Sequence, residues 1–174
     1  MIRLRTFAAF LALAPFAPGA AAAPEIEKAE LIKAAMIEKI ARFIDWPGPA
    51  PARFGLCIGG DHPQLGAVKA YYESFAIGDR PVEIQVLKRS DGMAGCRALF
   101  LAPREMADIG RLKAIAEKGH VLLVAEGADA ARNGAHVAFY SDMNKLRLEV
   151  NRRGLEASGL KASFRLLEMA KVVE

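Results

Sequence analysis

Residues 120–127 read HVLLVAEG, and five consecutive apolar residues lie inside this stretch. An apolar run of this length, followed by a glycine, is typical of a strand that is covered on both faces, as in parallel sheets. Residues 97–102, RALFLA, show the same pattern. Between them, Pro103 fits the first turn of a helix that extends to about Lys118. A buried strand, a helix and a second buried strand favour an α/β fold.

The rest of the chain continues this alternation. Four further strands are expected at residues 54–58, 82–89, 135–140 and 145–150, of which VEIQVLKR (82–89) has one wetter face. The last two strands flank the turn SDMN and form a hairpin. Further helices are expected at residues 65–75, in a short segment after Asn151, and from about Ser163 to Val173.

The first helix of the folded part is amphipathic and ends before Pro47, which disfavours a helical Trp46. Its apolar face is expected to hold Ile32, Met36, Ile40 and Phe43. The complete pattern predicts an α/β sandwich of a single domain. Its mixed sheet has about six strands flanked by helices, and the chain ends in a β-hairpin and C-terminal helices.

The composition agrees with one globular domain. The chain has 174 residues, 53% of them hydrophobic, which is enough for one core and too few residues for two ordinary domains. The net charge of +4 is modest, and the basic residues are spread along the chain. We therefore expect no nucleic acid partner.

The first 22 residues have the three parts of a secretory signal peptide. Arg3 and Arg5 precede an apolar stretch, TFAAFLALAPFAPG, and the small-residue segment AAAA follows. Cleavage after Ala22 would leave residues 23–174 as the mature domain. No later stretch is apolar enough to span a membrane, so we expect an exported, soluble protein. The alternative is that residues 1–22 form a buried or anchoring helix.

No pattern in the sequence indicates catalysis, and none indicates a metal or a cofactor. The turn Gly59-Gly60-Asp61 lacks the spacing of a nucleotide-binding loop, and no nucleophile elbow is present. The histidines, His62, His120 and His136, do not occur in pairs at ligand spacing. We expect a protein that is not an enzyme and that binds no metal or cofactor. A small-molecule cleft beyond the carboxyl ends of the strands remains open.

Cys57 and Cys96 are the two cysteines of the chain. In an exported protein two cysteines favour a disulfide, here between Cys57 and Cys96. We expect Cys57→Ser to cost about 2 to 4 kcal/mol of stability. The alternative is a pair of free, buried thiols.

Residues 145–151, KLRLEVN, alternate polar and apolar side chains, so Lys145, Arg147, Glu149 and Asn151 share one face of a strand. Arg147, Glu149 and Asn151 are therefore a candidate binding surface. The alternative is a solvated outer face without a functional role.

Five segments in this order resemble the YfiR family of periplasmic proteins. They are FIDWP (43–47), GLCIGGDHPQLG (55–66), CRALFLAPRE (96–105), HVAFYSDMNKLRLEVN (136–151) and GLKASFRLLEMAKVV (159–173). The resemblance covers about residues 29–173. It implies an α/β fold, a periplasmic location and often a homodimer. Cys57 and Cys96 match the family's disulfide positions.

The resemblance also implies a function. The best-understood member of the family represses an inner-membrane diguanylate cyclase by binding the cyclase's periplasmic sensory region, which lowers cyclic di-GMP and limits biofilm formation. Some members have a second cysteine pair near the hairpin, and DAARNGAHVAFY (129–140) has none. The second function open at this point is a periplasmic small-ligand binding protein that reports to another membrane receptor.

Overall fold

The computed structural model describes residues 28–59, 61–88 and 92–174, and the expected signal peptide lies outside these residues. The strands are β1 Ile44–Asp45, β2 Phe54–Gly59, β3 Val82–Leu87, β4 Ala98–Phe100, β5 Leu122–Glu126, β6 Val137–Asp142, β7 Lys145–Asn151, β8 Lys161–Ala162 and β9 Lys171–Val173. The helices are α1 Lys28–Arg42, α2 Leu65–Tyr72, the 3₁₀ helix η1 Pro103–Asp108, α3 Ile109–Gly119, α4 Arg152–Ala157 and α5 Phe164–Glu168.

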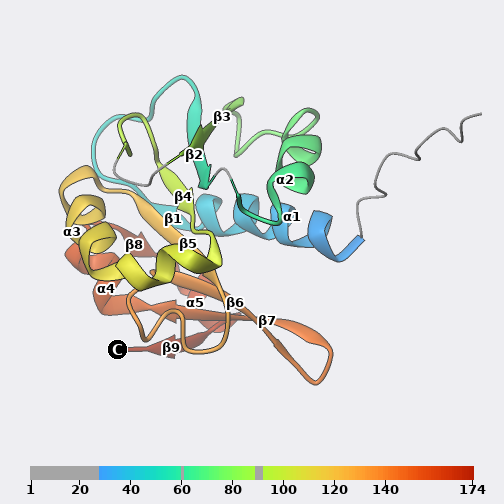
Figure 1. Cartoon of the computed structure of the whole chain (residues 1–174). Helices are drawn as coiled ribbons and strands as arrows, with labels where there is room; N and C mark the ends of the chain where they lie inside the picture. Colours follow the sequence, from blue (N-terminus) through green and yellow to red (C-terminus); the bar gives the residue numbers. More distant parts are fainter. Residues whose placement is uncertain (1–27, 60, 89–91) are drawn as a thin grey trace, which may run out of the picture.

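One seven-stranded mixed sheet with the strand order β3-β2-β4-β5-β6-β7-β9 organises the domain (Figure 1). Neighbouring strands from β3 to β6 run parallel, β6 and β7 form an antiparallel hairpin, and β9 lies parallel to β7. The strands β1 and β8 form a separate two-stranded sheet. The predicted α/β fold with a mixed sheet flanked by helices and a hairpin is confirmed.

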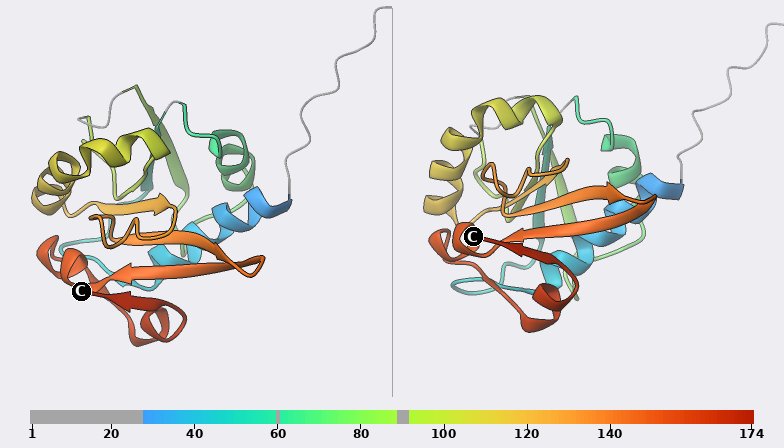
Figure 2. Two further views of the ribbon diagram at one scale, coloured as in Figure 1. Left: turned by 60° about the horizontal axis from the view of Figure 1, so that its bottom comes forward. Right: turned by 90° about the horizontal axis from the view of Figure 1, so that it is seen from below.

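Helices cover both faces of the sheet (Figure 2). The α1 and α2 side chains share a core with Phe54, Phe100 and Phe139 from one face. The α3 side chains Leu112 and Ala116 pack with the strand side chains on the opposite face of the sheet. The strand β5 is buried on both faces, because Leu122 and Val124 lie in the first core and Leu123 and Ala125 in the second. Its continuous apolar sequence follows from this position.

The C-terminal segment differs from the prediction. The expected helix from about Ser163 to Val173 ends at Glu168, and Lys171–Val173 form the edge strand β9. This strand adds to the predicted sheet beside β7, and Val173 is buried there. The β-branched pair Val172-Val173 suits a strand better than a helix end, and pairing with β7 satisfies backbone groups that a frayed helix end would leave exposed.

The inward face of α1 agrees with the prediction in part. Ile40 is buried, and Met36 and Phe43 are half-buried and pack against the core, but Ile32 is exposed. The buried face also includes Ala34, Ile37 and Ala41. Apolar residues occur on more than one side of this helix, so periodicity alone did not select the face, and the small alanine side chains allow close packing on the sheet. The helix expected at residues 65–75 ends at Tyr72, so Phe75 lies beyond α2, and it is exposed.

A close backbone contact brings residues 92–96 onto β2. A Cβ atom at Gly55 would overlap the carbonyl oxygen of Gly95, so only glycine fits at this position. Gly95 itself has a φ of +81°, in the left-handed region that glycine adopts readily. The two glycines together place Cys96 beside β2, the second strand of the sheet.

Candidate functional site

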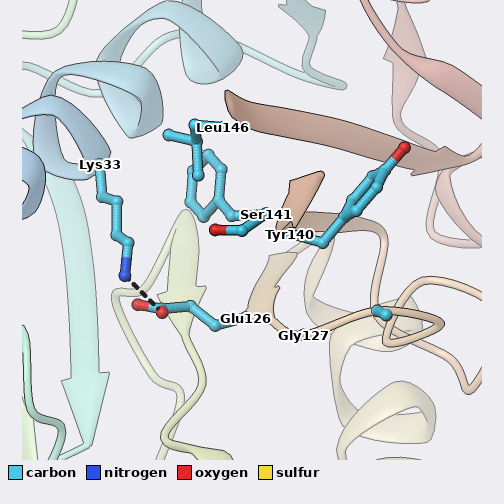
Figure 3. Close-up of a pocket in the computed structure, with 8 residues that line it drawn as sticks. Lys33, Glu126, Gly127, Tyr140, Ser141 and Leu146 are labelled. Carbon is cyan, nitrogen blue, oxygen red and sulfur yellow. Dashed lines mark hydrogen bonds and ion pairs between the residues drawn. The ribbon is translucent and has the colours of Figure 1, made fainter. Parts of the chain in front are cut away.

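A pocket of about 320 Å³ lies where β5 and β6 end, between α1 and the β6–β7 hairpin (Figure 3). Its lining residues come from three separate parts of the chain and are Lys33, Glu126, Gly127, Ala128, Phe139, Tyr140, Ser141 and Leu146. The strands β5 and β6 are parallel, so their carboxyl ends meet at this edge of the sheet. This is the edge at which open α/β sheets bind ligands.

An ion pair forms the polar end of the pocket. Lys33 Nζ of α1 lies 2.7 Å from Glu126 Oε2 at the end of β5, and the two side chains are 21% and 23% exposed. The other carboxylate oxygen, Glu126 Oε1, is buried and has no hydrogen-bond partner. This oxygen is covered by protein atoms, and a covered carboxylate oxygen without a hydrogen-bond partner is costly.

The β6–β7 hairpin supplies the opposite wall. Phe139 and Ser141 point to the same face of β6, and Ser141 lies opposite Leu146 in the hairpin register. Figure 3 shows the Ser141 hydroxyl pointing toward the side of the ion pair, with Leu146 next to it and Tyr140 turned away. The pocket therefore has a polar end and an apolar wall.

The order of the parallel strands also defines a topological switch point between β2 and β4. Successive connections leave this point in opposite directions, and ligands of open α/β sheets often bind there. Here Arg104 Nε lies 2.9 Å from Asp61 Oδ2 and joins the two loops that follow β2 and β4. The Glu105 carboxylate accepts a hydrogen bond of 2.7 Å from the backbone N–H of Ala102. Protein side chains thus link the two loops at this point.

His62 lies between the switch point and the pocket. Its ring packs on Phe100 with centroids 4.0 Å apart, and its Nδ1 accepts a hydrogen bond of 3.0 Å from the Gln64 N–H. Burial lowers the pKa of His62, and the carboxylates of Glu126 and Glu105 oppose this shift in part. The His62 imidazole is therefore neutral, and its Nδ1 is already hydrogen-bonded, so the ring mainly packs on Phe100. Its interaction with Glu126 is electrostatic.

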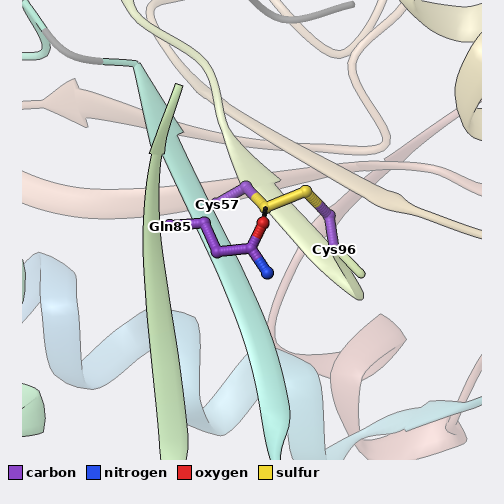
Figure 4. The surroundings of a disulfide bond; sticks show 3 residues. All are labelled: Cys57, Gln85 and Cys96. Atoms are coloured by element: carbon purple, nitrogen blue, oxygen red, sulfur yellow. Dashed lines mark hydrogen bonds between the residues drawn. A yellow bond between two sulfur atoms is a disulfide. The ribbon is translucent and has the colours of Figure 1, made fainter. Parts of the chain in front are cut away.

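The structure joins Cys57 and Cys96 in a disulfide with Cα atoms 5.6 Å apart, as expected (Figure 4). Neither cysteine is free. Gln85 Oε1 of β3 lies 3.9 Å from Cys57 Sγ, a contact rather than a hydrogen bond because a disulfide sulfur has no proton to donate. The bridge ties β2 to the segment that leads into β4, far from the pocket lining.

The predicted polar face of β7 has three different environments. Arg147 is exposed and lies 3.8 Å from Asp142. Glu149 is only 2% exposed and is 3.5 Å from Arg132 and 3.2 Å from Lys171. The 127–135 loop and β9 supply these two cations, so this part of the face is an internal contact.

Asn151 has a structural role at the end of the same face. Its Oδ1 accepts a hydrogen bond of 2.8 Å from the Gly154 N–H, which caps α4, and its Nδ2 donates to the Ala131 carbonyl at 3.0 Å. The three candidate residues thus belong to one face, on which Arg147 is exposed, Asn151 is half-buried and Glu149 is buried. A role in binding stays a prediction for all three.

The remaining histidines have structural partners. His136 is fully buried, its Nδ1 accepts a hydrogen bond from the Leu123 N–H, and its Nε2 lies 3.1 Å from Ser158 Oγ. Since Nδ1 accepts, Nε2 holds the proton and donates it to Ser158. Burial lowers the pKa of His136 to about 4. His120 Nδ1 lies 2.8 Å from the Ser158 carbonyl oxygen.

The described residues contain neither a metal-binding cluster nor a membrane-spanning helix. Within residues 28–59, 61–88 and 92–174, no group of three or more His, Cys, Asp or Glu side chains could hold a metal ion. No helix in these ranges is long and apolar enough to cross a membrane.

Sequence reasoning missed the pocket residues Lys33, Glu126 and Ser141. One signal was available, because Glu126 is a charged residue directly at the carboxyl end of an apolar parallel strand. Lys33 and Ser141 gave no local signal, since each looks like an ordinary surface residue in its own segment.

The fold and its pocket define a disulfide-linked α/β domain. The sequence matches the YfiR/HmsC-like family over residues 30–171, so the chain belongs to this family. No curated protein matches the sequence significantly.

Two solved structures share the fold. A conserved domain protein from Vibrio cholerae O1 biovar El Tor has a TM-score of 0.59 and 9% identity, with 83% of this chain covered. The ABC domain from Streptococcus pneumoniae, solved in complex with L-Trp, has a TM-score of 0.59 and 8% identity, also with 83% covered. This chain spans 60% of the length of each of these structures.

Proposed function

We propose that this protein is a periplasmic regulator that performs no chemistry. It binds the periplasmic sensory region of an inner-membrane diguanylate cyclase and holds the cyclase inactive, which lowers cyclic di-GMP. The family match over residues 30–171 is the observation that carries this proposal. The disulfide and the signal peptide expected at residues 1–22 support the periplasmic location.

A surface suited to protein binding lies on the last two elements. Phe164 is the first residue of α5, Met169 follows its last residue, and Val172 belongs to β9. All three side chains are exposed. We call these three residues the C-terminal apolar surface. In the described sheet β9 is also an edge strand that pairs with β7 alone. Exposed apolar groups beside an unpaired strand edge are typical of protein–protein contacts, and we place the cyclase contact here.

The energetic requirement is modest. A binder shifts a two-state receptor only by its difference in affinity for the two states. Changing a cyclase from almost wholly active to almost wholly inactive requires about 5.5 kcal/mol of such preference. An interface of ordinary size buries about 800 Å² on each partner, which a domain of this size can present.

The test combines binding and signalling. Deleting the gene should raise cellular cyclic di-GMP, and the mature protein should retain the cyclase when used as bait for detergent-solubilised membranes. Val172→Asp should weaken both repression of the cyclase and its retention by the bait, because it places a charge in the C-terminal apolar surface. Val86→Asp is the matched control, because Val86 lies on the opposite edge strand β3 and the two valines are 43% and 42% exposed. Unchanged cyclic di-GMP in the deletion strain, with the cyclase expressed, would refute repression.

A second function, small-ligand binding with a report to another membrane receptor, is favoured by the pocket between α1 and the β6–β7 hairpin. Wild-type repression together with ligand-dependent release of the cyclase would join the two functions. Ligand binding without any effect on a cyclase would favour the second alone.

A further inference from the structure

The polar end of the pocket is neutral overall but rich in unused hydrogen-bonding capacity. Lys33 has three N–H donors, and the structure uses one of them on Glu126. Glu126 Oε1 accepts nothing. The Ser141 hydroxyl points toward this pair and can donate or accept (Figure 3). A ligand that fits must therefore offer donors and acceptors close together.

The existing ion pair discriminates between ligand classes. A zwitterion or an anion would have to be desolvated and would compete with the 2.7 Å contact between Lys33 and Glu126. Removing charged groups from water is costly, and their new contacts rarely repay all of it. A neutral hydroxyl group costs far less to desolvate, and it can accept from Lys33 and donate to Glu126 without separating the pair.

We propose that this pocket binds a neutral, polyhydroxylated ligand, a saccharide, through the Lys33–Glu126 pair and Ser141. Neighbouring hydroxyls of one sugar ring accept from Lys33 Nζ and donate to the Glu126 carboxylate. Glu126 Oε1 is covered in the structure, so binding includes a small rotation about the terminal torsion of Glu126, which is broad in carboxylates.

The rest of the pocket agrees with this class of ligand. Leu146, which is half-buried, gives an apolar wall on which the C–H face of a sugar ring can lie. The volume of about 320 Å³ is at the lower end of ligand sites, which suits one or two sugar rings. A sugar here would contact α1, β5 and the β6–β7 hairpin at once.

The test uses the mature protein and a panel of neutral sugars, namely glucose, galactose, N-acetylglucosamine and maltose, at millimolar concentrations. Glycine and inorganic phosphate represent zwitterions and anions. We expect at least one sugar to give saturable binding by calorimetry and saturation-transfer NMR. Its affinity should change less than twofold between low and high salt, because a neutral ligand is not screened.

Three pocket variants and one control locate the site. Glu126→Gln and Lys33→Met should each weaken sugar binding by about tenfold or more, and Ser141→Ala by about threefold, as expected for single hydrogen bonds with and without charge. Glu83→Gln is the control, because it alters the exposed Arg53–Glu83 pair on β3 outside the pocket lining. Ser141 is exposed, so its variant should fold even if the other two do not.

Several results would overturn the saccharide site. These are no binding by any sugar of the panel, binding of glycine or phosphate in preference to sugars, or sugar binding that survives all three pocket variants. The site stands independently of the proposed function. If Glu126→Gln loses sugar binding while repression of the cyclase persists, the regulator proposal is unaffected. If repression is never found, sugar binding remains testable.

Discussion

Removal of the Cys57–Cys96 disulfide should lower the free energy of unfolding by about 4 kcal/mol. The double variant Cys57→Ala, Cys96→Ala is the best perturbation, because it leaves no free thiol. Both side chains are buried, and alanine is small enough to enter their sites without overpacking. The expected loss therefore reports mainly the removal of the crosslink.

The magnitude follows from the closed loop. The two cysteines are 39 residues apart. In the chain-entropy model a loop of this length removes about 13 cal/mol/K from the unfolded chain, which is about 4 kcal/mol at 25 °C. With a urea dependence of about 2 kcal/mol/M for a domain of this size, the unfolding midpoint should decrease by about 2 M.

Urea unfolding followed by far-ultraviolet circular dichroism is the assay, with the oxidised wild type, the reduced wild type and the double variant compared side by side. The reduced wild type separates the crosslink from the loss of two sulfur atoms. A midpoint within about 0.5 M of the oxidised protein in both samples would refute the reasoning, since it corresponds to only about 1 kcal/mol.

Three further predictions concern single residues. Gly55→Ala should destabilise the domain by more than about 3 kcal/mol or prevent folding, because its methyl group would overlap the Gly95 carbonyl. Gly66→Ala on α2, with open space around it, should instead raise the free energy of chemical unfolding by up to about 1 kcal/mol. Stability should decrease as the pH falls from 6.5 toward 4, by about 1 kcal/mol at pH 5.5, because the folded pKa of His136 is about 4 and the unfolded chain binds the proton first; His136→Gln should flatten this part of the stability–pH curve. Asn151→Ala should cost about 1 kcal/mol or more, because it removes the cap of α4 and a second hydrogen bond; an unchanged melting temperature would contradict this assignment.

The central sheet could be predicted because its signals are local. The strands β4 and β5 are covered on both faces, so each reads as a continuous apolar run, and the hairpin β6–β7 has a turn between two strand patterns. The strand β9 could not be found in this way. Three residues after a short helix have no periodicity of their own, and Lys171–Val173 is a strand because β7 lies beside it.

The face of β7 shows the limit of alternation as evidence. The pattern in residues 145–151 correctly placed Arg147 and Glu149 on one face, but alternation does not say what covers that face. Arg132 lies in the 127–135 loop and Lys171 lies on β9, so both are distant from Glu149 in the sequence. Their side chains pair with the Glu149 carboxylate inside the fold. The solvated-face alternative therefore also fails at Glu149, for a reason that only the tertiary structure contains.

The pocket depends still more on long-range contacts. Lys33 and Glu126 are 93 residues apart, and no local pattern connects a lysine in an amphipathic helix with a glutamate after an apolar strand. Topology could have connected them, because parallel strands bring their carboxyl ends to one edge and the charged residue that ends a buried strand must find a partner there. Lys33 is that partner for one oxygen of Glu126. The second oxygen has no hydrogen-bond partner among the described residues, and a ligand hydroxyl that donates to it, as proposed above, would lower the cost of covering it.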